Sequence, residues 1–594
     1  ASACPPWPPI PIFERGTRTS VCRLSLSLSL SLSLALSLAR SDMYTGVMLN
    51  LRISWLLALS ASGGAVALAA GETVQGKYLR PLNDDCIAQG LGLSSLGSTT
   101  TGQYFPSEFV TDMTPQRFQT GTEDAEKFTV AYYDTYKVVV NEVANITYVL
   151  YECGSDVPDA GSVPEGAAFF QVPLTSLSVS ETVPFAFLEA LGVADRVHDV
   201  SPYVTSACGQ KLVACGRRSP TYMGFDGVLD EAAVKEGTKV ADAIIVGSAG
   251  KDAPPPLLAF DAENDPGLLR RAEWIKYLGL FFNREKKAAE VYAAIVARYE
   301  AVKKQSMAEV EAGAEPVIAW VSHYNYDGEE HFDVSFAGYK EELVGDVGGT
   351  MPAGSAQALV DAIPGTRLGQ FSEDTVEFAW EAVGDEGTFA SREAAEAAFL
   401  EFLSGVDAVV DESYALDPAT YDFATEYGFA APAELLVYRL DGKLSEENGY
   451  DWFESSFVRP DLALRDVQRI ADSARQGENV DGFEFTWLRN IDEDPVVVVA
   501  SECERIKSCD QKPDPICPFV QVCGDGKTAL LLEDSYESYT DGASCRYESC
   551  DEIAGSASND PNDENEENAA QMAAPAVVLI TLLVVFVEAL LQFC

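Results

Sequence analysis

The segment from His323 to Asp333 carries the densest set of potential metal ligands in the chain. It reads HYNYDGEEHFD and brings two of the three histidines together with four carboxylates. Imidazole and carboxylate groups are common ligands of divalent metal ions. A solvated acidic loop would have the same composition, and the third histidine, His198, is distant in sequence. Direct metal binding, with His323, His331 and Asp333 as ligands, is therefore an alternative hypothesis.

A second group of polar and aromatic residues follows predicted strands, where α/β proteins bind their ligands. Hydroxyl groups at a helix start lie beside backbone N–H groups that favour an anion, and tyrosines suit a bulky chelate. Serine and threonine at such positions are also ordinary helix caps. The candidate ligand-binding residues are Ser176, Ser178, Ser180, Glu181, Thr182, Tyr203, Ser248, His323, Tyr324, Tyr326, Asp411 and Glu412.

The elements that must position these residues alternate between strands and helices. Short apolar runs favour strands, and apolar stripes at helical spacing favour helices. Asp265 is expected to cap one helix, with Pro266 in its first turn. The strands are predicted at 137–153 (a hairpin), 168–174, 241–247, 316–322 and 407–413. The helices are predicted at 181–192, 265–282, 284–305, 340–349 and 462–474.

The order of these elements predicts two α/β lobes separated by a long helix. At the standard rise, the helix over 284–305 would be about 30 Å long. The roughly 430 residues between the two ends of the chain suit two domains better than one small core. The predicted fold class is α/β, with two Rossmann-like lobes at 73–283 and 314–500, one linking helix at 284–306 and a Cys-rich extension at 503–550.

The composition argues against several functions. The net charge of −51 argues against nucleic-acid binding, which requires basic patches. A charge of this size favours solubility. The sequence contains no HExxH, GxSxG or Walker motif and no complete GxGxxG. We therefore do not predict an enzyme, and a surface hydrolase, a reductase and an adhesive protein are kept as weaker alternatives.

Cysteine usage indicates the secretory pathway. The chain has 13 cysteines, and ten remain once Cys4, Cys22 and Cys594 are set aside. An even number favours disulfides in an oxidising compartment, although spacing does not give their pairing. The sequence Asn145-Ile-Thr is an N-glycosylation sequon, which suits the same compartment.

The beginning of the chain is expected to lie outside the fold. Residues 1–42 contain the alternation SLSLSLSLSLSLALSLAR, which a CT-dinucleotide repeat would encode. We interpret them as a translated untranslated region. Residues 43–70 combine Arg52, an apolar run and the small-residue sequence Ala67-Leu-Ala69, a pattern typical of a secretory signal peptide.

The end of the chain predicts attachment to a membrane. Residues 551–571 are acidic without a single basic residue and are expected to form a disordered stalk. Residues 572–594 form an apolar tail with Glu588 inside it and no basic residue after it. This tail suits a GPI-anchor signal, with a single transmembrane helix as the alternative. Either form predicts the outer face of the plasma membrane or a luminal face.

Three segments together resemble the class III periplasmic binding proteins of bacteria, which carry iron–siderophores, haem or cobalamin. They are VPLTSLSVSETVPFAFLEALGVADRVHDVS, EWIKYLGLFFNREKKAAEVYAAIVARYEAV, and PVIAWVS followed by EELVGDVGG. The resemblance covers about residues 125–495. The chain departs from the family in its long loops, its extra cysteines, its Cys-rich extension and its apolar tail.

The resemblance implies that a ligand binds in the cleft between two lobes, with little hinge motion. The leading hypothesis is a cell-surface protein that captures an Fe(III) chelate, such as a ferric siderophore, for uptake, without an intrinsic cofactor. Haem, cobalamin and a bare divalent metal ion are the alternatives. The resemblance also implies a delivery partner: an importer, which the family docks through acidic residues on helices comparable to those of Glu236 and Glu342, or else a reductase or an endocytic partner.

Overall fold

The structure is a computed structural model. It describes residues 124–530, apart from 134, 154, 224–227, 248–255, 311–314, 327–328, 370–371, 381–387, 481–482, 504–505, 510–519 and 523–527. All of these residues except Val228 belong to one compact unit. None of the helices in this part of the chain is long and apolar enough to cross a bilayer. The predicted signal peptide, acidic stalk, apolar tail and most of the Cys-rich extension lie outside the described residues.

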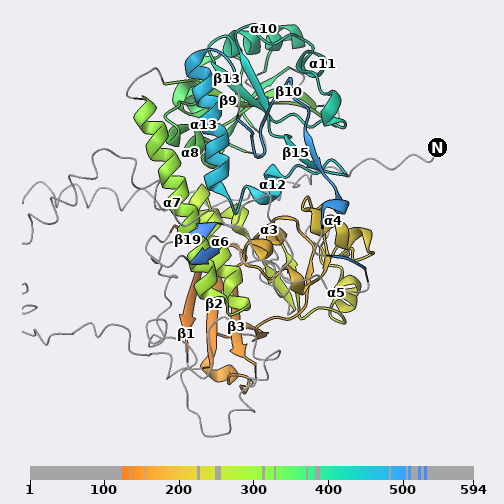
Figure 1. The fold of residues 1–594 in the computed structure, drawn as a ribbon. Helices are drawn as coiled ribbons and strands as arrows, with labels where there is room; N and C mark the ends of the chain where they lie inside the picture. Colours follow the sequence, from red (N-terminus) through yellow and green to blue (C-terminus); the bar gives the residue numbers. More distant parts are fainter. Residues whose placement is uncertain are drawn as a thin grey trace, which may run out of the picture. The chain divides into compact units, whose positions relative to one another are not determined.

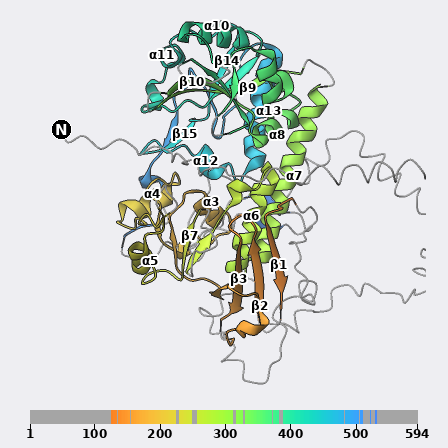
Figure 2. The ribbon, with the colours of Figure 1, turned by 180° about the vertical axis from the view of Figure 1, so that it is seen from behind.

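The described residues form a mixed α/β structure with two hydrophobic cores. Most residues of each core come from one part of the chain, so we call 124–283 the first half and 315–499 the second half. Helix α7 (Glu285–Val310) contributes to both cores, because Ala288, Val291 and Ile295 pack in the first and Tyr299 in the second. Figures 1 and 2 show α7 beside elements of both halves. A helix is present where one was predicted over 284–305, and Ala288, Val291, Ile295 and Tyr299 on it are buried.

The first half opens with a four-stranded sheet in the order β1-β2-β3-β4. The hairpin predicted within 137–153 is confirmed, because β2 and β3 pair antiparallel. Asn145 is exposed in the turn between them and has a φ of 54°, a left-handed conformation that asparagine tolerates. The strands are β1 (Phe128–Tyr132), β2 (Tyr136–Asn141), β3 (Ile146–Glu152) and β4 (Ala168–Val172).

A second sheet of the first half is entirely parallel, in the order β6-β5-β7-β8. Its strands are β5 (Leu177–Val179), β6 (Val197–Val200), β7 (Ala243–Val246) and β8 (Leu257–Ala259). Its helices are α3 (Val183–Ala190), α4 (Ala207–Ala214) and α5 (Glu231–Gly237). The strand that leads into α3 is therefore β5. The predicted strand at 168–174 forms β4 of the other sheet.

Helix α6 (Leu268–Phe281) corrects one predicted cap. Asp265 does not cap this helix, which begins after Gly267, at a φ of 106°. The Asp265 carboxylate is fully buried and accepts hydrogen bonds from the backbone of Glu126 and Lys127 and from the Trp274 indole. The Asp265 carboxylate therefore holds the beginning of the described chain against α6.

The second half is built on a seven-stranded sheet in the order β11-β12-β10-β9-β13-β14-β16. The central strands β9, β13 and β14 run parallel, and the strands towards both edges are antiparallel. The strands are β9 (Ile318–Tyr326), β10 (Glu329–Ser335), β11 (Arg367–Leu368), β12 (Thr375–Ala379), β13 (Ala408–Asp411), β14 (Leu436–Arg439) and β16 (Arg489–Asn490). The helices are α8 (Gly338–Asp346), α9 (Ala356–Ala362), α10 (Arg392–Leu403), α11 (Phe423–Tyr427), α12 (Trp452–Ser455) and α13 (Pro460–Gln476).

The end of the second half returns to the first. Strand β17 (Val496–Val498) pairs with β15 (Lys443–Ser445), and the chain then enters the first core at Cys503. Two disulfides join Cys208 to Cys503 and Cys215 to Cys509, and Cys153 is disulfide-bonded as well. The prediction of disulfides is confirmed. The start of the Cys-rich extension is therefore part of the folded body. A short hairpin of β18 (Val520–Val522) and β19 (Thr528–Leu530) packs on α7.

Candidate functional site

The carboxyl ends of the parallel strands in the first half meet the second half. Five residues after the end of β6, Thr205 donates its backbone N–H to Glu454 (2.8 Å) and its hydroxyl to Asp451 (2.5 Å). At the start of α6, the N–H of Leu268 donates to Glu342 of α8 (2.9 Å). Both contacts join residues that are far apart in sequence. They fix the edge at which ligands of α/β proteins bind.

A pocket of about 180 Å³ lies between the two halves, and both contribute to its wall. The first half supplies Leu268 and Arg271 at the start of α6. The second half supplies Tyr339, Trp452, Phe453, Ser456, Phe457 and Ala463. Its largely apolar lining with one charged group is of the kind found in small-molecule sites, but its volume is below the roughly 300–1,000 Å³ usual for them.

Arg271 is the charged group of this pocket. Its guanidinium lies 4.6 Å from the centre of the Tyr339 ring and 5.1 Å from that of Phe457. Burial lowers its pKa, and the opposing influence of nearby acidic groups, Glu263 and Glu342 among them, is smaller. Because arginine remains protonated even so, the pocket holds a permanent cation on two aromatic rings.

Lys340 is a second cation at the junction, and it is already neutralised. Its ammonium is buried, is hydrogen-bonded to the Glu412 carboxylate and donates to Ser335 (2.9 Å). Burial alone would lower its pKa, but the Glu412 carboxylate and the Tyr339 hydroxyl raise it above the ordinary value. Lys340 is therefore protonated at neutral pH, and Glu412 is engaged by it.

Exposed aromatic rings surround the junction. Tyr414, Tyr450 and Phe453 form a row with successive ring centres 6.4 Å apart. Tyr414 is 57% exposed and Phe453 is 49% exposed. Tyr203 of the first half is half exposed. Its backbone carbonyl oxygen lies close to Gly449, next to Tyr450, because a Cβ placed on Gly449 would be 3.1 Å from that oxygen. Exposed aromatic groups concentrated at one place mark a binding surface.

Four of the predicted residues lie at this carboxyl edge. Ser180 follows β5 and donates to the carbonyl of Ile245 (3.0 Å). Glu181 is exposed beside Gly247 at the end of β7, and Thr182 directly precedes α3. Tyr203 is the fourth.

Two of the predicted serines lie elsewhere because β5 is Leu177–Val179. Ser176 precedes the strand, at its amino end, and donates to the carbonyl of Val240 (2.6 Å). Ser178 is within the strand and fully buried, hydrogen-bonded to Asp199 and to the hydroxyl of Tyr222 (2.6 Å). Both predictions are wrong in position, since neither hydroxyl faces the junction.

Asp411 is a structural residue. It is fully buried and pairs with Arg439 (2.9 Å), while the hydroxyls of Tyr421 and Tyr427 also donate to it. A carboxylate with this many partners has no free lone pair facing a ligand. The prediction that Asp411 touches a ligand is therefore wrong.

The register of β9 and β10 separates the two histidines of the metal hypothesis. His323 pairs with Phe332, and His331 pairs with Tyr324. Since neighbouring residues of a strand point to opposite faces, His323 and His331 lie on opposite faces of the sheet. One ion therefore cannot bind both, and in the described residues no three His, Cys, Asp or Glu side chains form a metal-binding group.

Each of these histidines has its own carboxylate partners. His323 is almost buried between Glu426 (2.9 Å) and Glu330 (3.1 Å). His331 is bonded to Asp333 (2.7 Å) and is stacked by Tyr324 at 4.6 Å. Burial alone would lower the pKa of His331, yet the hydrogen bond to Asp333 raises it. Of the other predicted residues, Tyr326 ends β9, and Ser248 lies outside the described residues.

The sequence reasoning missed Arg271, Tyr339, Tyr414 and Phe453. Tyr414 follows β13 by three residues, so the rule that selected Asp411 and Glu412 would have found it two residues further on. The other three are contributed by helices or by the turns next to them. No strand-based rule points to such positions.

Comparison with known proteins gives neighbours in structure only. No protein-family profile and no curated protein matches the chain. A periplasmic haem-binding protein from Pseudomonas aeruginosa is 13% identical, with 54% of this chain and 99% of that chain covered and a TM-score of 0.33. The siderophore periplasmic binding protein from the fuscachelin gene cluster of Thermobifida fusca is 16% identical, with 52% and 98% covered and a TM-score of 0.32. The periplasmic vitamin B12 binding protein of Vibrio cholerae is 13% identical, with 51% and 99% covered and a TM-score of 0.30. These neighbours are periplasmic binding proteins, and at such values the likeness says nothing about what this chain binds.

Proposed function

We propose that this chain is a ligand-binding protein that captures a small iron chelate at the junction of its two halves. The observation that carries the proposal is the combination of exposed aromatic rings with one cationic pocket at the carboxyl edge. Tyr203 comes from the first half and Tyr414 and Phe453 from the second, on the same junction as Arg271. Aromatic faces bind bulky, largely apolar ligands with little loss of entropy, and the guanidinium supplies one directed polar contact.

The charges of the junction narrow the class of chelate. Lys340 is neutralised by Glu412, acidic groups surround Arg271, and the chain as a whole carries a charge of −51. A strongly anionic ligand would meet repulsion that the single guanidinium of Arg271, already close to acidic groups, offsets only in part. We therefore propose an uncharged or weakly charged ferric chelate, of the trihydroxamate type, rather than a tricatecholate.

The place of action and the delivery route are proposals from the sequence. The signal peptide, the sequon at Asn145 and the apolar tail favour a glycosylated protein on the outer face of the plasma membrane. The tail would serve as a GPI anchor or as a single span. From there the chelate would pass to an importer, to a reductase or into an endocytic route.

The test is a ligand panel on the purified full-length protein. Intrinsic fluorescence and melting temperature are recorded with a ferric trihydroxamate, a ferric tricatecholate, haem, cobalamin and free Fe(III), Zn(II) and Mn(II). A ligand that binds only the native state raises the melting temperature by mass action. We expect micromolar or tighter binding of the trihydroxamate and much weaker binding of the tricatecholate. The absence of any response to all seven would overturn the proposal.

A further inference from the structure

The chain crosses between the two halves a second time after β17, and this crossing is covalently fixed to α4. The turn Ala500–Glu502 packs on α4. Two disulfides then join α4 and the residue that ends it to the chain beyond this turn, through Cys503 and Cys509. We call this turn and the two disulfides the strap. It links covalently two parts of the chain that are otherwise connected along the chain through α7 and the whole second half.

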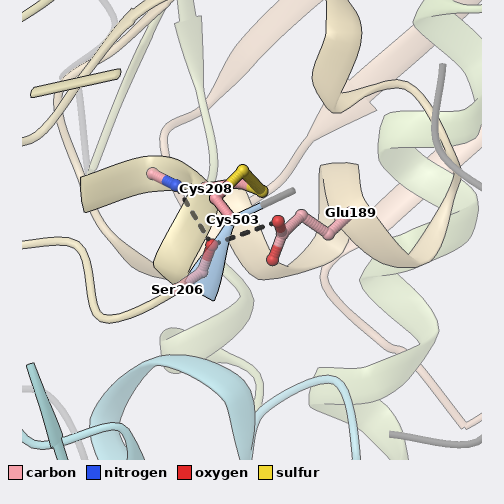
Figure 3. Close-up of a disulfide and its surroundings, with 5 residues drawn as sticks. Glu189, Ser206, Cys208 and Cys503 are labelled. Atoms are coloured by element: carbon pink, nitrogen blue, oxygen red, sulfur yellow. Dashed lines mark hydrogen bonds between the residues drawn. A yellow bond between two sulfur atoms is a disulfide. The ribbon is translucent and has the colours of Figure 1, made fainter. Parts of the chain in front are cut away.

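The strap adjoins the contact between the halves. Cys208 is in the first turn of α4, and Thr205, three residues earlier, is the residue hydrogen-bonded to Glu454 and Asp451. Between them, Ser206 accepts the N–H of Gly209 and donates to Glu189 (3.1 Å), as Figure 3 shows beside the Cys208–Cys503 disulfide. The start of α4 therefore carries the Cys208–Cys503 disulfide close to the hydrogen bonds of Thr205 to the second half. We call these hydrogen bonds the joint.

A polar contact reinforces the same attachment. Gln210 donates to the carbonyl of Val498 (3.0 Å) and accepts the N–H of Glu446 (3.1 Å). Both partners belong to the second half, next to β17 and β15. Reduction of both disulfides would leave α4 without a covalent tie here, with these hydrogen bonds and the packing of the turn Ala500–Glu502 remaining.

We propose that the strap is a redox switch that holds the two halves in their ligand-binding arrangement and releases the ligand when a dithiol reduces it. In each step one S–S bond breaks, and each sulfur takes up one electron and one proton. The attacking dithiol loses two electrons and two protons and forms its own disulfide. In an oxidising exterior the strap stays closed, and in a reducing compartment the joint at Thr205 loosens.

The burial of the cysteines sets the order of reduction. Cys509 is exposed and Cys215 is half buried, whereas Cys208 and Cys503 are 8% and 6% exposed. Because thiol–disulfide exchange requires access to a sulfur atom, the Cys215–Cys509 disulfide is reduced first and the Cys208–Cys503 disulfide second. The second step is the one that frees the joint.

The test follows amide hydrogen exchange in the oxidised full-length protein and in the same protein reduced with dithiothreitol. The Thr205 amide, which donates to Glu454, is read by fragmentation mass spectrometry, and the amides of β7 and β13 serve as internal controls. We expect Thr205 to exchange at least about tenfold faster after reduction while both strands stay protected. The paired replacement Cys208→Ser with Cys503→Ser should give the same loosening without a reductant, and the pair Cys215→Ser with Cys509→Ser should not. Unchanged Thr205 exchange, or loss of protection in both strands together, would overturn the switch.

A second arm measures release of the ligand and rests on the proposed function. The gallium(III) trihydroxamate is used, because a dithiol does not reduce gallium. Its dissociation rate should rise several-fold on reduction, and an equal rate in both redox states would contradict release. If no chelate binds at all, the proposed function fails, and the exchange of Thr205 still decides whether the strap controls the joint.

Discussion

Thr205 and Glu454 are 249 residues apart in sequence, and the backbone N–H of the first donates to the carboxylate of the second over 2.8 Å. Both residues are buried. This contact places the carboxyl edge of the first half against α12 of the second. The edge where the site forms is thus defined by a buried carboxylate, and its protonation has consequences for stability.

Glu454 is expected to make the protein less stable as the pH rises. Burial, and then the nearby carboxylate of Asp451, raise its pKa well above the usual value, and one of its oxygens has no partner among the described residues. The free-energy cost of ionising Glu454 in the folded protein is absent below its pKa of about 4.3 in the unfolded chain. The cost grows as the pH rises from there towards the pKa in the folded state. Glu454→Gln should therefore raise the melting temperature more at pH 8 than at pH 5.

The matched control for this prediction is Glu434→Gln, at an exposed position of the second half. It should shift the melting temperature equally at both pH values. If Glu454→Gln behaves in the same way, the carboxyl is ionised without penalty and the explanation is wrong.

Asp411 is expected to matter for stability and not for ligand contact. Replacing it with alanine leaves the fully buried guanidinium of Arg439 with Asp441 as its one remaining acidic partner among the described residues. Removing one partner of a buried ion pair costs about 3–5 kcal/mol, which urea unfolding measures. Glu236→Ala, which breaks the exposed pair with Lys239, should change little. A cost for Asp411→Ala no larger than that of Glu236→Ala would contradict the structural role.

Glu412 is expected to determine the charge preference of the site. Glu412→Gln removes the carboxylate that neutralises Lys340 and frees a cation at the junction. The affinity for a ferric tricatecholate should then rise about tenfold, while that for a trihydroxamate stays nearly constant. Competition titrations of the two chelates against wild type and variant measure the ratio. An unchanged ratio would show that this charge pair has no influence on the ligand.

The sequence was informative about elements and uninformative about which residues approach one another. The long amphipathic helix, the 137–153 hairpin and the buried strand at 241–247 were predictable because their hydrophobic periods are local properties. The cap at Asp265 failed because its carboxylate is used by residues 126 and 127, far away in sequence. No local pattern carries that information.

In the candidate site too, features set by local sequence were predictable, and contacts between residues far apart in sequence were not. Ser180, Glu181 and Thr182 lie at the carboxyl edge because the start of α3 is a local signal, and their contact with a ligand stays a prediction. Ser178 was misplaced because the strand that leads into α3 is β5, which contains this residue, and not the predicted strand at 168–174. The two histidines were grouped because they are close in sequence, whereas the alternation of strand side chains separates them.

The central claim is that the exposed aromatic rings at the junction bind the chelate. The most direct test is the dissociation constant of a ferric trihydroxamate for the wild type and for the double variant Tyr414→Ala with Phe453→Ala. The control is Val157→Ala, which changes an exposed apolar residue of the first half. Each lost ring contact should cost about 0.5–1.5 kcal/mol, so the double variant should bind about tenfold or more weakly and the control should bind as wild type does. Equal binding by the double variant and the wild type would contradict the proposed site.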